Sequence, residues 1–133
     1  MPSLDKFFNP KSVAVIGASN QRGKVGFSIL EALRDKFKGE IYPVNPHETE
    51  IMMLKVYPSV LDIKEPVDLA VIAVPREAVA KVLKECVKKR VEAVVLVTSG
   101  YSEVGDKKAE EDLQKIIKGT KTRIIGPNCL GVF

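Results

Sequence analysis

Five short runs of apolar and β-branched residues constrain the fold more than any other feature of the sequence. They occupy residues 12–17, 40–44, 68–74, 92–98 and 122–126. The runs are almost continuously apolar instead of alternating with polar residues, which is typical of parallel strands covered on both faces. We therefore expect five buried strands.

Helical patterns separate most of these runs, because apolar residues recur there at spacings of three and four. The three stripes are Gly26, Ile29, Leu30, Leu33 and Phe37; Val79, Val82, Leu83, Cys86 and Val87; and Ala109, Leu113, Ile116 and Ile117. Alternating strands and helices predict right-handed crossovers and a Rossmann-like, doubly wound α/β fold, with a parallel five-stranded sheet and helices on both faces. Residues 47–66 are less regular and predict a short helix or turn and a connection punctuated by prolines.

Length and composition fit one globular domain over residues 1–133. Hydrophobic residues make up 45% and charged residues 29% of the chain, and no apolar run approaches the roughly 20 residues that cross a bilayer. The first residues, MPSLDKFFNPKS, lack the apolar core of a secretory signal, so we expect a cytoplasmic protein with no membrane partner. An open sheet that ends at its fifth strand would leave an edge for self-association into a homo-oligomer.

The remaining composition argues against several classes of function. Cys86 and Cys129 are far apart and His47 is the single histidine, so we predict no metal site and no redox dithiol. The net charge of +4 is modest, with lysines scattered through amphipathic helices. Without a basic stripe carrying interleaved aromatic residues, it suits an anionic small ligand better than a nucleic acid.

The segment VAVIGASNQRGKVGFSIL has the form of a phosphate-binding turn between a strand and a helix. Gly17 would permit a tight turn, and Gly26 would let the helix pack close to the sheet. N–H groups of residues 23–25 would point at an anion, to which Arg22 and Lys24 could add charge-assisted hydrogen bonds. Glycine-rich turns also occur for packing reasons, and that alternative stays open.

The residues that end the second run separate candidate ligands. An NAD site usually carries Asp or Glu there, bound to the adenosine ribose. In PVNPH, Asn45 takes this place, Pro46 stiffens the turn and His47 supplies a donor. A ribose bearing an extra phosphate, as in coenzyme A (CoA) or NADP, would meet no negative charge and is favoured over NAD. The residues alone leave open that VNP is only a strand-ending turn.

Six stretches resemble, in order and spacing, the N-terminal CoA-binding domain of ADP-forming (NDP-forming) acyl-CoA and acetyl-CoA synthetases. That domain is similar to one in the α subunit of succinyl-CoA synthetase. The stretches are FFNPKSVAVIGAS, GKVG, IYPVNP, VDLAVIAVP, TSGYSEVG and RIIGPNCLGV. PVNP and GPNCLG are the most specific, because a generic nucleotide-binding fold gives no reason for them. The resemblance covers nearly the whole chain.

The resemblance implies that CoA lies across the carboxyl edge of the sheet. Its phosphates would lie at the glycine-rich loop, its adenosine end at the second strand, its pantetheine arm along the third and fourth strands, and its thiol near Asn128. The implied CoA-binding residues are Gly17, Ala18, Ser19, Arg22, Gly23, Lys24, Val25, Gly26, Val44, Asn45, Pro46, His47, Val74, Pro75, Thr98, Ser99 and Asn128.

In that family, acyl-CoA, ADP and phosphate are interconverted with acid, CoA and ATP through an acyl phosphate and a phosphorylated histidine. The resemblance implies that ATP-grasp and phosphohistidine-bearing domains or subunits are partners. We therefore expect this chain to bind CoA or acyl-CoA and to catalyse nothing alone. Two alternatives stay open: a stand-alone CoA-binding regulatory or carrier module, and an NAD(P)-binding oxidoreductase domain, which PVNPH disfavours.

Two positions depart from the family pattern. The family tends to have glycine at Met53, so either the backbone differs here or Met53 is strained; alternatively, Met52 and Met53 form an apolar contact surface. His47 stands where the family often carries lysine. Because an ordinary imidazole is largely uncharged at neutral pH, a phosphate contact there would be weakened.

Overall fold

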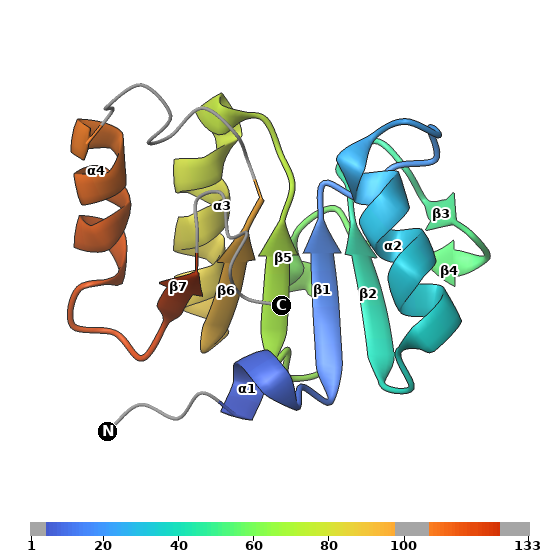
Figure 1. Ribbon diagram of the computed structural model, residues 1–133, viewed down its shortest axis with the longest axis horizontal. Helices are drawn as coiled ribbons and strands as arrows, with labels where there is room; N and C mark the ends of the chain where they lie inside the picture. Colours follow the sequence, from blue (N-terminus) through green and yellow to red (C-terminus); the bar gives the residue numbers. More distant parts are fainter. Residues whose placement is uncertain (1–4, 98–106, 126–133) are drawn as a thin grey trace.

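A parallel five-stranded sheet forms the centre of the computed structural model, which describes residues 5–97 and 107–125. Its strands are β1 (Ser12–Ile16), β2 (Glu40–Val44), β5 (Leu69–Ile72), β6 (Ala93–Leu96) and β7 (Arg123–Ile125). They lie in the order β2-β1-β5-β6-β7, and every neighbouring pair is parallel (Figure 1). The five predicted strands and their parallel arrangement are confirmed.

Helices cover both faces of this sheet, as predicted. The helices are α1 (Asp5–Phe8), α2 (Val25–Lys36), α3 (Arg76–Lys89) and α4 (Lys107–Ile117). Buried side chains of α2 join one core cluster, and those of α3 and α4 join the other. The chain moves from β1 to β2 in one direction and later from β5 to β7 in the other, so right-handed crossovers place their helices on opposite faces. None of the helices in the described residues is long and apolar enough to span a membrane.

The less regular segment forms a small hairpin and a short 3₁₀ helix. Strands β3 (Glu50–Ile51) and β4 (Leu54–Lys55) pair antiparallel, and η1 (Val60–Asp62) follows them. Ser59 caps η1, because its hydroxyl accepts a hydrogen bond of 3.1 Å from the Leu61 N–H. The short helix was predicted, but the hairpin was not.

The turn of this hairpin consists of Met52 and Met53, whose φ angles are +52° and +66°. Two-residue turns with positive φ usually carry Asn-Gly, because a side chain is unfavourable in the left-handed region. Met53 therefore has the strained backbone that the sequence raised as one of its alternatives. The Met53 side chain is 85% exposed, whereas Met52 packs partly buried against the core.

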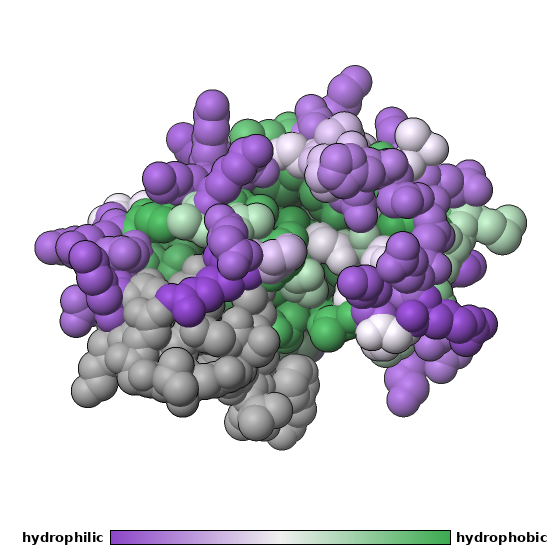
Figure 2. All heavy atoms as spheres, turned by 90° about the horizontal axis from the view of Figure 1, so that it is seen from above, coloured by the Kyte–Doolittle hydropathy of each residue, from purple (hydrophilic) through white to green (hydrophobic). Residues whose placement is uncertain are grey.

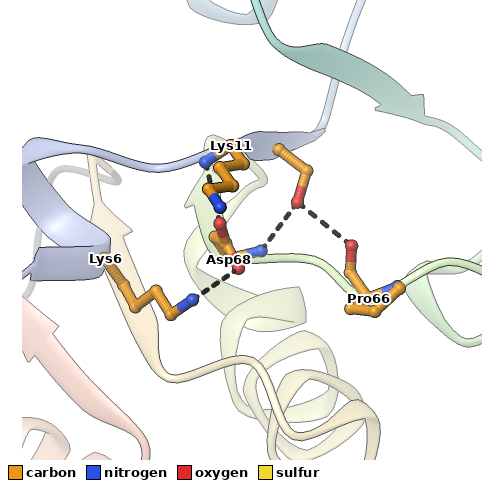
Figure 3. A network of polar contacts seen from close by, with 5 residues as sticks. Lys6, Lys11, Pro66 and Asp68 are labelled. Atoms are coloured by element: carbon orange, nitrogen blue, oxygen red, sulfur yellow. Dashed lines mark hydrogen bonds and ion pairs between the residues drawn. The ribbon is translucent and has the colours of Figure 1, made fainter.

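A polar network ties the beginning of β1 to the beginning of β5 (Figure 3). Asp68 accepts hydrogen bonds from the Lys6 ammonium at 3.1 Å and from the Lys11 backbone N–H at 2.8 Å. The Ser12 hydroxyl accepts from the Asp68 N–H and donates to the Pro66 carbonyl. Burial acts to raise the pKa of Asp68, but the hydrogen bonds and charges of Lys11 and Lys6 outweigh burial and lower the pKa.

Candidate functional site

The carboxyl ends of β1 and β5 mark the point at which the strand order reverses. From β1 the chain goes outward to β2, and it then returns to β5 on the other side of β1. Open α/β sheets bind their ligands at such a point. Figure 2 looks down on this edge and shows hydrophobic residues in the middle with hydrophilic residues on either side.

Two glycines let the loop after β1 take its shape. Gly17 has a φ of +97°, and a Cβ on it would overlap the carbonyl group of Ala73, which follows β5. A Cβ on Gly26 would overlap the carbonyl oxygen of Gly17. Only glycine can therefore occupy either position without moving the backbone, which matches the tight turn and close helix packing predicted for them.

The beginning of α2 offers backbone N–H groups to a ligand. Its N-cap, Lys24, is extended and makes no side-chain capping hydrogen bond, and no acidic residue lies in the first turn. Such a terminus binds anions well, because unpaired N–H groups and the helix dipole both attract negative charge. Arg22 and Lys24 are exposed beside it, and the Arg22 guanidinium lies 5.5 Å from the centre of the Phe27 ring.

Backbone hydrogen bonds fasten the same loop to the end of β2. The Gly17 and Ala18 N–H groups both donate to the Val44 carbonyl, at 3.0 and 3.3 Å. The Asn45 side chain donates to the Ala18 carbonyl at 2.8 Å and accepts from the His47 N–H at 2.7 Å. Asn45 thus holds two loops together and closes a local turn, a use of Asn that is common before a bend.

A second tether between these loops was missed by the sequence reasoning. The Asn20 amide donates to a Glu48 carboxylate oxygen at 2.6 Å and to the Glu50 carbonyl at 3.2 Å. A carboxylate therefore does lie close to the end of β2, contrary to the expectation that none would be met there. Its oxygen is engaged by Asn20, and no local sequence pattern links residues that are 28 positions apart.

Five more of the predicted site residues lie at the same edge. Ser19 accepts a hydrogen bond from the Gln21 N–H, and Pro46 and His47 are exposed beyond β2. Val74 is partly buried, and Pro75 is the N-cap of α3. Thr98, Ser99 and Asn128 lie outside the described residues.

Metal and thiol chemistry find no support in the described parts of the chain. No three His, Cys, Asp or Glu side chains gather there as a metal ion would need. Cys86 is fully buried, and burial, with a smaller effect of Glu85, raises the pKa of its thiol to about 12. Its nucleophilic thiolate form is therefore strongly disfavoured.

Comparison with protein families gives a match to the CoA binding domain over residues 11–133. Acetate–CoA ligase (ADP-forming) of Methanocaldococcus jannaschii is 54% identical over 93% of this chain, which spans 18% of that protein. The α subunit of acetate–CoA ligase (ADP-forming) II of Pyrococcus furiosus is 45% identical over 98% of this chain, and the match covers 29% of the subunit.

A solved structure shares the fold closely. Acetyl-coenzyme A synthetase 1 of Ca. Korarchaeum cryptofilum, in complex with phosphate and ADP, superposes with a TM-score of 0.92 at 43% identity. The match covers 96% of this chain and 28% of the synthetase. This chain therefore spans less than a third of each of these relatives.

Proposed function

Because the chain belongs to the family of CoA binding domains, we propose that it binds CoA or acyl-CoA as one part of an ADP-forming acyl-CoA ligase. The observation that carries this proposal is the start of α2, a helix without a side-chain cap at the point where the strand order reverses. In this account CoA is a substrate and not a resident cofactor.

The phosphates of CoA bind at the beginning of α2 in this proposal. Backbone N–H groups of Gly23, Val25 and Gly26 receive the diphosphate, whereas the Lys24 N–H already donates to the Gln21 carbonyl at 3.2 Å. The exposed side chains of Arg22 and Lys24 add positive charge. Gly23 has a φ of +93° with open space around it, so the loop can turn its N–H groups outward there. Gly17, Ala18 and Val44 support the site from below through hydrogen bonds between their backbone groups.

The adenosine end of CoA lies against residues 44–47 in this proposal. Asn45 is occupied by its bonds to Ala18 and His47, so its role is to position the loop. His47 is exposed and is the residue that can meet the extra phosphate of the CoA ribose. Asn20 restrains Glu48, which limits the repulsion between that carboxylate and the phosphate.

The pantetheine arm crosses the hydrophobic middle of the edge (Figure 2). It passes Val74 and Pro75, which lie between the end of β5 and the beginning of α3. Thr98 and Ser99 complete this path, and the thiol ends near Asn128. Small and apolar protein groups suit the pantetheine arm, because this arm is an uncharged chain that contains amides. These three residues enter on the family resemblance alone.

The complete reaction needs more than this chain supplies. We propose that ATP-grasp and phosphohistidine-bearing domains or subunits, in the cytoplasm, provide the catalytic groups that interconvert acyl-CoA, ADP and phosphate with acid, CoA and ATP. The short share of each relative that the chain spans supports this, as does the α-subunit name of the P. furiosus relative. No residue of this chain is proposed to be catalytic.

Isothermal titration of the chain with CoA, dephospho-CoA, NAD and NADP tests the proposal. We expect saturable binding of CoA that weakens without the 3′-phosphate. Lys24→Ala should weaken CoA binding about fivefold through loss of a charge-assisted contact, whereas the matched exposed control Lys81→Ala should not. Binding of NAD or NADP without CoA, or no binding of any of the four, would contradict the proposal.

A further inference from the structure

The edge of the sheet opposite the candidate CoA site carries three adjoining hollows. They have volumes of about 390, 520 and 680 Å³. The first and second share Arg90 and Glu92, and the second and third share Gly119 and Thr120. In Figure 1 this amino edge is the lower border, where α1, the end of α3 and the beginning of β7 lie.

Basic side chains dominate the lining of these hollows. The first hollow is lined by Lys6, Lys64, Lys89 and Arg90, together with Asp68 and Glu92. Lys121 joins the lining in the second hollow. Lys115, Lys118 and Arg123 line the third.

The positive charge of the chain is concentrated around these hollows. Eight of the 21 Lys and Arg residues line them, against two of the 17 acidic residues, which gives the lining a formal charge of +6. The remainder of the chain is then at −2, although the total is +4. The lysines that look scattered in the sequence are thus gathered by the fold.

Several of these cations are oriented by carbonyl groups, which leave their charge unneutralised. The Lys89 ammonium donates to the Ile63 carbonyl. The Arg123 guanidinium donates to the Thr120 and Thr122 carbonyls, both at 2.9 Å. A cation that is held in place in this way loses less conformational entropy when it meets a carboxylate.

We propose that this amino edge binds an acidic segment of a protein partner. Carboxylates complement a surface of this charge, and the hollows can receive side chains. None of the described residues that line them is aromatic, so the stacking contacts of single-stranded nucleic acid binders are missing. The relatives are more than three times as long as the matched region, so further protein segments are available to pack on a domain of this kind. This inference rests on the charge distribution and does not require CoA binding.

Fluorescence anisotropy with a labelled ten-residue oligo-glutamate peptide tests this inference on the full chain. The variant Lys64→Glu/Lys118→Glu/Lys121→Glu changes one exposed lysine in each hollow. The control Lys81→Glu/Lys84→Glu/Lys108→Glu changes three exposed lysines of α3 and α4 that line none of the hollows, by the same total charge. Circular dichroism verifies that both variants fold, and a 20-base-pair DNA and phosphatidylglycerol vesicles serve as competing probes.

We expect the peptide to bind the unmodified chain, to lose about tenfold or more in affinity with the edge variant, and to lose about twofold or less with the control. Equal losses in both variants would show that binding follows net charge alone and would overturn the inference. Absence of peptide binding would overturn it as well. Tighter, edge-dependent binding of DNA or vesicles would overturn the assignment to a protein partner.

Discussion

Met53 shows how a single residue can oppose the conformation that its position requires. Its φ of +66° lies in the left-handed region, and its side chain is 85% exposed, so little packing offsets the strain. Met53→Gly should therefore raise the free energy of unfolding by about 0.5–1 kcal/mol, the left-handed penalty less the extra chain entropy of glycine. Urea unfolding measures this gain.

Met52 provides the matched comparison for this prediction. It also has a positive φ, but its side chain packs against the core. Met52→Gly should raise the free energy of unfolding by less than Met53→Gly does, or should lower it, because the loss of a packed side chain opposes the relief of strain. A loss of stability in Met53→Gly would mean that the exposed side chain makes a favourable contact.

Asp68 gives the stability a dependence on pH. Its pKa is lowered in the folded protein because the bonds from Lys11 and Lys6 outweigh burial. Folding therefore favours the ionised carboxylate, which stabilises the folded state. This stabilisation is fully present above the ordinary Asp pKa of about 4, and it is lost as the pH falls through the lower pKa of the folded protein. Asp68→Asn should lower the free energy of unfolding by about 1–2 kcal/mol at neutral pH and by less at about pH 3, where the carboxyl group of the unfolded chain is largely protonated.

Urea unfolding of both proteins at the two pH values checks this difference. Asp35→Asn changes an exposed carboxylate on α2 and is the control, expected to have little effect at either pH. If Asp68→Asn lowers the free energy of unfolding by the same amount at both pH values, the ionised carboxylate of Asp68 is not the source of the stabilisation.

At the scale of elements, the position of α2 depends on the absence of one side chain. A Cβ on Gly26 would overlap the Gly17 carbonyl oxygen, whereas a Cβ on Gly23 would meet no atom within 4 Å. Gly26→Ala should lower the free energy of unfolding by more than about 3 kcal/mol, because the backbone of the loop or of α2 has to move. Gly23→Ala should cost about 1–2 kcal/mol, from its φ of +93° alone. Chemical unfolding compares the two, and equal costs would contradict the close approach of α2 to the loop.

The elements also show what sequence reasoning can predict. The five strands of the sheet and the three longer helices were predicted because each repeats an apolar pattern over several residues. Strands β3 and β4 have two residues each and α1 has four, which is too short for a periodic pattern. The hairpin was further hidden because Met52 and Met53 occupy a turn that usually carries Asn-Gly.

The candidate site was predictable to a similar degree. The roles of Gly17 and Gly26 follow from their place between a strand and a helix, so the local sequence suffices. The tether from Asn20 to Glu48 depends on how β1 and β2 lie side by side, and only the three-dimensional arrangement brings these residues together.

At the scale of the whole molecule, the two proposed partners occupy opposite edges of the sheet. Charges exposed to solvent are screened over about 10 Å at ordinary salt concentrations. The edge variant Lys64→Glu/Lys118→Glu/Lys121→Glu should therefore leave the dissociation constant for CoA within about twofold of its original value. Calorimetric titration at about 0.1 M salt measures this, and a large loss of CoA affinity would mean that the two edges are coupled.

Labelling of Cys86 can measure how often the core opens, because this residue lies in the core cluster that joins α3 and α4 to the sheet. In a Cys129→Ser background, which leaves Cys86 as the single thiol, native labelling by a thiol reagent should be at least about a thousandfold slower than in concentrated urea. Both burial and the pKa of about 12 keep the thiolate from the reagent.

The dependence of this labelling on denaturant separates global from local opening. If Cys86 becomes accessible only when the core opens, the free energy of opening should fall with urea at the same slope as the free energy of unfolding. Fraying of the end of α3 would expose little surface and give a much smaller slope. Because Cys86 packs with both helices and the sheet, we expect the steep dependence. A shallow dependence would show that the end of α3, which lines the hollows of the amino edge, opens independently of the rest of the protein.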